Sequence, residues 1–107
     1  MPKYLVEASY TAEGLKGLYK DKASGRKKAV EQACASLGGK LEGFYYCFGK
    51  NDAIVIVDLP DNATAAGFSL RAAASGLVTT RTTVLLTVEE ADQALKKSPK
   101  YRAPGKA

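Results

Sequence analysis

The feature that most constrains this chain is the order in which strand-like and helix-like segments follow one another. Strand-forming residues alternate over positions 4–10, and apolar residues recur at helical spacing between positions 11 and 37. Two further strand-like segments occupy 40–48 and 52–59, a helical segment runs from 61 to 76, and a strand-like segment covers 77–86. The run Thr87-Val88-Glu89-Glu90 has the form of a capping box and predicts a last helix through about Lys97.

A β-α-β-β-α-β order followed by a helix is the split βαβ pattern of ferredoxin-like α+β folds. Right-handed crossovers would place the strands in the order 77–86, 4–10, 52–59 and 40–48. The β-branched run from Ile54 to Val57 predicts a central strand that is buried on both faces. Both long helices would cover one side of the sheet, so a partner subunit is the economical cover for the other side.

Turn and cap residues predict where the segments end. Asp21–Gly25 divides the first helical segment into two pieces, and Gly38 with Gly39 ends it. The run Gly49-Lys50-Asn51 predicts a tight turn between the second and third strands. Asp61 is placed to cap the next helix.

Size and composition indicate one globular domain. The 107 residues are 46% hydrophobic and 25% charged, which is typical of a chain that buries a core. We expect a folded domain over residues 1–97 and an irregular tail over 98–107. No apolar run approaches the ~18 residues that would span a bilayer, and no signal-peptide core follows Met1. The sequence therefore predicts a cytoplasmic protein without a membrane partner.

The positive charge is concentrated at the end of the chain. Residues 1–95 contain 11 Lys/Arg and 11 Asp/Glu, so the net charge of +5 comes from the last twelve residues. A nucleic-acid-binding domain normally carries its basic stripe on the fold, with aromatic side chains among the basic ones. This distribution argues against a nucleic-acid partner and leaves open an interaction module that works through its basic tail.

Several kinds of catalytic and metal site are missing from the sequence. The absence of His removes the Ser-His-Asp and Cys-His arrangements and His-ligated zinc. Cys34 and Cys47 are too widely spaced for a zinc framework or a redox pair. We therefore predict no metal site and no cofactor, and no catalytic residue can be assigned.

Six short motifs occur along the chain: Thr11–Gly14, Ser24–Arg26, Leu37–Leu41, Phe48–Asp52, Leu59–Asp61 and Tyr101–Gly105. Taken together, these motifs resemble the GYD-domain family over roughly residues 2–104. That resemblance implies a dimeric α+β barrel-type fold in a group of small proteins whose function is largely uncharacterised. The family's Gly-Tyr-Asp signature is similar to Gly49-Lys50-Asn51-Asp52 here, with Asn51 where Tyr is expected.

Glu7 and Arg81 form the most informative pair of candidate site residues. If the first and last strands pair antiparallel about their midpoints, Glu7 lies opposite Arg81. Arg81 would then hold a carboxylate or phosphate ligand in a cavity between the sheet and a partner. The alternative is a cross-strand ion pair with no ligand, worth about 0.2–1 kcal/mol.

Tyr46 and Asp52 are two further candidates. By alternation Tyr46 shares a row with Glu42, Phe44 and Phe48, and its phenol would orient a ligand beside Glu7 or belong to the core or an interface. Asp52 would bind a ligand at the cavity mouth or accept hydrogen bonds from turn amides.

Two functional readings follow for the whole chain. The first is a homodimer or higher oligomer that binds a small ligand in the sheet cavity or acts structurally. The second, implied by the resemblance to dimeric α+β barrels, is a cofactor-independent monooxygenase or isomerase. In that case Glu7, Tyr46 and Arg81 would together bind and deprotonate the substrate.

Overall fold

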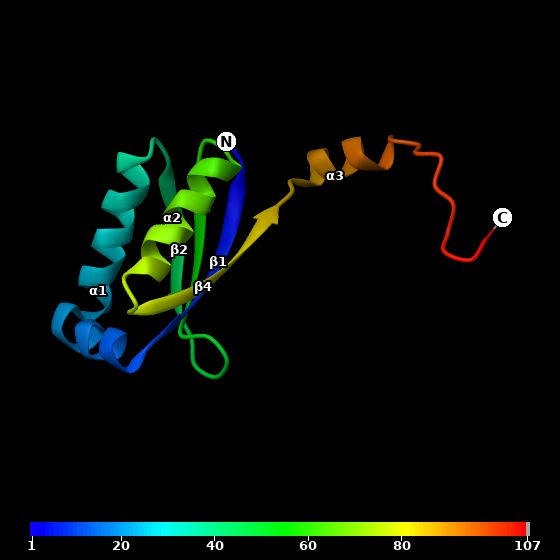
Figure 1. Ribbon diagram of the computed structural model, residues 1–107. Helices are drawn as coiled ribbons and strands as arrows, with labels where there is room; N and C mark the ends of the chain where they lie inside the picture. Colours follow the sequence, from blue (N-terminus) through cyan, green and yellow to red (C-terminus); the bar gives the residue numbers. More distant parts are fainter. Residues whose placement is uncertain (107) are drawn as a thin grey trace.

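The computed structural model describes residues 1–106 as a four-stranded antiparallel sheet with two helices on one face and a third helix beyond it (Figure 1). The strands are β1 (Lys3–Tyr10), β2 (Lys40–Tyr46), β3 (Ala53–Asp58) and β4 (Val78–Leu85). The helices are α1 (Ala12–Ser36), α2 (Asn62–Ala74) and α3 (Val88–Leu95). This order confirms the predicted ferredoxin-like α+β fold.

The strands lie in the order β2-β3-β1-β4, as the sequence predicts. β1 is central and pairs antiparallel with both β3 and β4. Its register sets Val6 opposite Val55 on one side and Glu7 opposite Arg81 on the other. The predicted pairing of Glu7 with Arg81 across the first and last strands is therefore confirmed.

Each helix begins at a side chain that satisfies a free backbone N–H group. Thr11, Asp61 and Thr87 each accept a hydrogen bond from the N–H three residues later, at 3.1, 2.8 and 3.0 Å. At α3 the Glu90 carboxylate also accepts from the Thr87 N–H at 2.9 Å. The predicted caps at Asp61 and Thr87 are confirmed.

α1 is broken at Lys22, inside the predicted interruption at Asp21–Gly25. Lys22 has φ 68° and ψ 165°, which is not helical and is rare for a residue with a side chain. The break divides α1 into a short first segment and a longer one that begins at Ala23. It therefore lets the two parts of α1 follow different directions over the sheet.

The core lies between the sheet and α1 and α2, on the side that we call the helix face. Tyr4 and Val6 of β1 are buried there against Val55 and Val57 of β3 and Cys34 of α1. Burial of the three strand valines and their neighbours removes apolar surface from water at roughly 25 cal/mol per Å². Alternation along β1 and β3 thus places the apolar core on one side of the sheet.

Tyr4 connects this core to the start of α2. Its hydroxyl donates a hydrogen bond to Asn62 Oδ1 at 2.7 Å, so the buried phenol has a polar partner. Burial raises the pKa of Tyr4 above its ordinary value. The neutral phenol is therefore the form that the folded chain favours.

The other side of the sheet, which we call the open face, carries the alternate residues of the same strands. Leu5, Ile54, Ile56 and Leu85 lie on it and are only half-buried in the single chain. The expectation of a central strand buried on both faces therefore holds on the helix face alone. No other part of residues 1–106 covers this apolar surface.

β2 departs from strict alternation at a bulge between Leu41 and Gly43. Glu42 accepts a hydrogen bond from Lys3 Nζ at 2.6 Å across the open face, whereas Phe44 packs against the core on the helix face. The expectation that Glu42, Phe44, Tyr46 and Phe48 form one row is wrong. The extra residue of the bulge reverses the side on which the following residues lie.

α3 and the residues after it extend away from the sheet (Figure 1). The Cα radius of gyration is 17.1 Å, compared with ~13 Å for a compact domain of about 100 residues. Residues 98–106 contain no helix or strand, and position 107 of the predicted tail lies outside the described residues. Across positions 1–106, no helix is both long and apolar enough to span a bilayer.

Gly14 provides a test of the contact between α1 and the start of β4. A Cβ atom at Gly14 would overlap the carbonyl oxygen of Leu77, which also accepts a hydrogen bond from Thr11 N at 3.0 Å. We expect Gly14→Ala to lower the free energy of unfolding by about 1–3 kcal/mol, because backbone must move to admit the methyl group.

Gly17 is the matched control, because no atom lies within 4 Å of its Cβ position. Gly17→Ala should raise the free energy of unfolding by up to ~1 kcal/mol through helix propensity. Urea denaturation followed by circular dichroism measures both variants. Similar effects at the two glycines would contradict the close approach at Gly14.

Candidate functional site

The register of β1 and β4 builds a small polar hollow on the open face, at the end where the β2–β3 hairpin turns. Glu7 of β1 and Arg81 of β4 line it together with Lys50 and Asn51 of the hairpin loop. Its volume is about 250 Å³. Ser9, Thr79 and Thr80 complete the lining.

The hollow's carboxylate is held by the hairpin and not by the arginine. Asn51 Nδ2 donates a hydrogen bond to Glu7 Oε2 at 2.9 Å. Within the described part of the chain, no carboxylate oxygen lies within 4.0 Å of the Arg81 guanidinium. The predicted cross-strand pair is therefore brought together in register without forming an ion pair.

Further hydrogen bonds fix the rim of the hollow. Ser9 Oγ donates to the Lys50 carbonyl at 3.1 Å, which ties the hairpin loop to β1. Thr79 Oγ1 donates to the Ser9 carbonyl at 3.4 Å. The loop that carries Lys50 and Asn51 is thus anchored beside Arg81, whose guanidinium keeps its donors for a ligand.

Asp52 has the structural role that the sequence allowed as one of two alternatives. Its Oδ2 accepts a hydrogen bond from the Tyr10 N–H at 2.8 Å, and its own N–H donates to the Ala8 carbonyl at 2.8 Å. The Cys47 N–H donates to the Asp52 carbonyl at 2.8 Å. Asp52 therefore connects the hairpin to the end of β1, and it does not line the hollow.

Tyr46 lies on the helix face, away from Glu7 and Arg81. Its hydroxyl donates to the Ala23 carbonyl of α1 at 3.3 Å, and its ring centroid is 5.0 Å from that of Phe44. Burial, followed by the neighbouring Tyr10 phenol, raises the pKa of Tyr46 to about 12. A joint site of Glu7, Tyr46 and Arg81 is therefore not formed, because the sheet separates Tyr46 from the other two.

The aromatic residue that does lie on the open face of β2 is Tyr45. It pairs with Ile54 in the sheet register, and its side chain is 67% exposed. The sequence placed one of the two adjacent tyrosines on this face, and the bulge decides which one. Tyr45 lies across β3 from Glu7, so it borders the apolar surface rather than the polar hollow.

Sequence reasoning missed two contributors to the hollow. The sequence predicts only a turn role for Asn51. Nothing in the residues around Asn51 indicates its hydrogen bond to Glu7, which lies 44 positions earlier in the chain. Lys50 was likewise assigned to the turn alone. The register gives the signal that was available: a hairpin joining β2 and β3 must end beside the residues of β1 that pair with Ala53 and Ile54.

The chemistry of the hollow suits a small anion. It contains the cations Lys50 and Arg81 and one carboxylate, Glu7, so its net charge is positive. Arginine presents paired N–H donors that match a carboxylate or phosphate. Among residues 1–106, no three His, Cys, Asp or Glu side chains are grouped as metal ligands would be.

Removing the Asp52 carboxylate tests its structural role. We expect Asp52→Ala to lower the free energy of unfolding by about 1–3 kcal/mol, because the Tyr10 N–H loses its acceptor. Asp52→Asn keeps an oxygen acceptor and should cost less than Asp52→Ala. Thermal and urea denaturation measure both variants, and an unchanged stability in Asp52→Ala would return Asp52 to the ligand-binding candidates.

Comparison with known protein families agrees with the motifs in the sequence. The model of the GYD domain matches residues 4–95, which is well over half of the chain. Comparison with curated proteins and with solved structures gives no match. The matched segment begins at the second residue of β1 and ends with the last residue of α3, so it contains all of β1 except Lys3, the other three strands and all three helices. The chain belongs to the GYD-domain family.

Proposed function

We propose that this GYD-domain protein is a homo-oligomer that assembles through the open face of its sheet and binds a small anionic ligand in the hollow at Glu7 and Arg81. The observation that carries the proposal is the incomplete burial of the open face. A sheet with helices on one side normally buries its other apolar side against a further layer.

The apolar part of the open face fits a second copy of the same chain. Leu5 of β1 pairs with Ile56 of β3 and lies diagonally next to Leu85 of β4, and Ile54 follows Ile56 on the same side of β3. A two-fold interface brings the same surface of two subunits together, so one apolar patch covers the other. Exposed contiguous apolar patches are uncommon on soluble monomers.

α3 supports self-association independently of the sheet. Val88, Ala91 and Leu95 recur at i, i+3 and i+7 and make one apolar stripe on this helix. Val88 is 76% and Leu95 81% exposed in the single chain. A second subunit beside the sheet would bury this stripe as well as the open face.

The hollow lies at the edge of the same surface, so assembly would enclose it. A partner sheet would exclude water from Arg81 and strengthen its interaction with an anion. Glu7 is held by Asn51, so Arg81 and Lys50 supply the charge that an anion would meet. The ligand class is therefore a small carboxylate or phosphate compound.

The assembly is tested by placing a charge in the proposed interface. We expect native mass spectrometry to give a homo-oligomer for the natural chain and a monomer for Ile56→Lys, because an unpaired ammonium at the centre of an apolar interface is costly. Leu70→Lys is the matched control, since Leu70 is 70% exposed on α2. The assembly proposal fails if the natural chain is a monomer, or if Ile56→Lys assembles as the natural chain does.

The ligand is tested on protein purified from its own host. We expect an extra mass under gentle ionisation that is absent under denaturing conditions. Arg81→Gln should lower the fraction of protein that carries this mass by about tenfold or more, since a charge-assisted hydrogen bond contributes ~1.5–3 kcal/mol. Arg102→Gln in the tail removes the same charge and should keep the ligand. An oligomer with no added mass would remove the ligand from the proposal and leave a structural role.

A further inference from the structure

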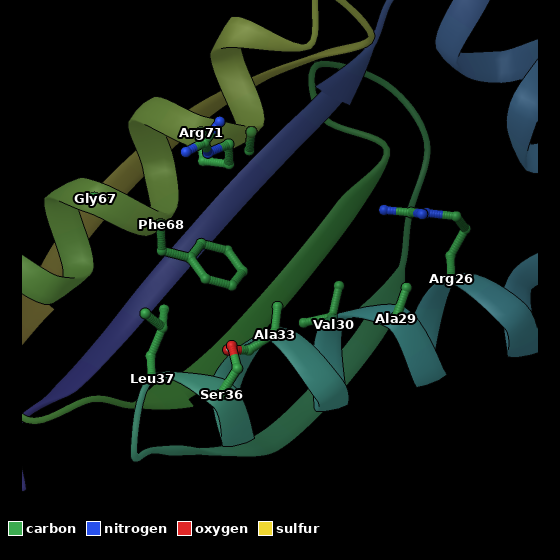
Figure 2. A pocket seen from close by; sticks show the side chains of 10 residues that line it. Arg26, Ala29, Val30, Ala33, Ser36, Leu37, Gly67, Phe68 and Arg71 are labelled. Carbon is green, nitrogen blue, oxygen red and sulfur yellow. The ribbon is translucent and has the colours of Figure 1, made fainter.

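A second cavity lies on the opposite side of the molecule, between α1 and α2. Figure 2 shows the two helices facing one another across a groove, with the sheet as its floor. Its volume is about 460 Å³, within the ~300–1,000 Å³ range of small-molecule sites. α1 packs over β2 and α2 over β4, so the groove runs above the two central strands.

One wall of the groove is a helical stripe of α1. Arg26, Ala29, Val30 and Ala33 are spaced so that all four lie on the same side of the helix, and all line the groove. The three aliphatic side chains are small, so α1 leaves room where a larger residue would reach towards α2. This wall is therefore apolar along its length and cationic at the end nearest the break in α1.

The facing wall belongs to α2. Phe68 extends its ring into the groove, and Gly67 beside it has no atom within 4 Å of its Cβ position (Figure 2). Phe68 and Val30 also line a narrower space of about 100 Å³ beneath, whose floor includes Val6 and Val55 of the sheet. The groove thus continues downwards into the apolar interior.

Two arginine residues lie at the same end of the groove. α1 and α2 run in opposite directions, which brings Arg26 of α1 and Arg71 of α2 to one end (Figure 2). The nearest carboxylate to Arg26 is Asp21 at 3.7 Å, which is too long for a hydrogen bond. Arg71 makes no ion pair within residues 1–106.

Arg26 is held at this end by the break in α1. The segment that carries it begins at Ala23, whose carbonyl accepts the hydrogen bond from Tyr46 on β2. Backbone in a rare conformation persists when surrounding contacts determine it, and Lys22 lies directly before this anchored residue. Arg26 also lines the narrower space below the groove, and Figure 2 shows its side chain pointing across the groove towards α2.

We propose that the groove between α1 and α2 is a binding site for an amphipathic carboxylate, with its carboxylate on Arg26 and its apolar body along Ala29, Ala33 and Phe68. An apolar channel with a guanidinium group at one end, whose contact with Asp21 is long at 3.7 Å, is complementary to a ligand with one negative head and an extended apolar chain. This site lies on the helix face, and the hollow at Arg81 lies on the open face. The two sites are therefore independent.

The test uses 8-anilinonaphthalene-1-sulfonate, an anionic aromatic probe whose fluorescence increases in apolar surroundings, and its displacement by decanoate. We expect the natural chain to bind the probe and decanoate to displace it, with decanol at least tenfold weaker because it lacks the charge. Arg26→Gln should lower the affinity for decanoate by about tenfold or more. Lys27→Gln removes the same charge from the exposed neighbouring residue and should bind as the natural chain does.

A second variant keeps the test decisive if the loss of Arg26 disturbs the fold. Gly67→Leu places a side chain in the open part of the groove and should also lower the affinity for decanoate by tenfold or more. Ala73→Leu, on an exposed position of the same helix, is its control. Circular dichroism verifies that each variant is folded.

Two results would overturn the groove site. One is unchanged decanoate binding in both Arg26→Gln and Gly67→Leu. The other is loss of decanoate binding in Arg81→Gln with Arg26→Gln unaffected, because that would place the probe on the open face. Decanoate binding that persists in the Ile56→Lys variant would support the groove and show that binding does not require the proposed assembly.

Discussion

The pairing of β1 with two neighbours is the constraint on which the rest of the structure depends. β1 is central, so the registers of β3 and β4 are both counted from it. Its alternation sends Tyr4 and Val6 into the core and Leu5 and Glu7 to the open face. A slip of one residue would exchange these two sets and bury Glu7 under the helices, which is why the hydrophobic pattern fixes the register so strongly.

The order of the strands and helices could be predicted from the sequence. The contacts between residues that lie far apart in the sequence could not. Counting from strand midpoints was enough to bring Glu7 opposite Arg81, because antiparallel pairing needs only one reference point. The bulge before Gly43 has no comparable signal, since glycine is compatible with a regular strand, a bulge or a turn. That single extra residue moved Tyr46 from the expected site to the contact with α1 at Ala23.

The two candidate sites differ in how much of each could be predicted from the sequence. The hollow on the open face follows from register, so Glu7 and Arg81 were found while Asn51 was interpreted as local. The groove follows from the separation between two helices, which sequence periodicity does not give. Arg26 begins the stripe of α1 that lines the groove, and its proposed role depends on the separation between α2 and α1.

α3 supplies the last argument for a partner. Isolated helices shorter than about 12–15 residues are marginal in water, and α3 has eight residues. Its capping box contributes on the order of 1 kcal/mol, yet Ala91 is its one half-buried residue within the described chain. A helix this short gains its remaining stability by packing its apolar stripe. Within residues 1–106 the body of the same subunit does not provide that packing. In the proposed assembly a neighbouring copy would stabilise α3, beside the sheet face that also lacks a cover.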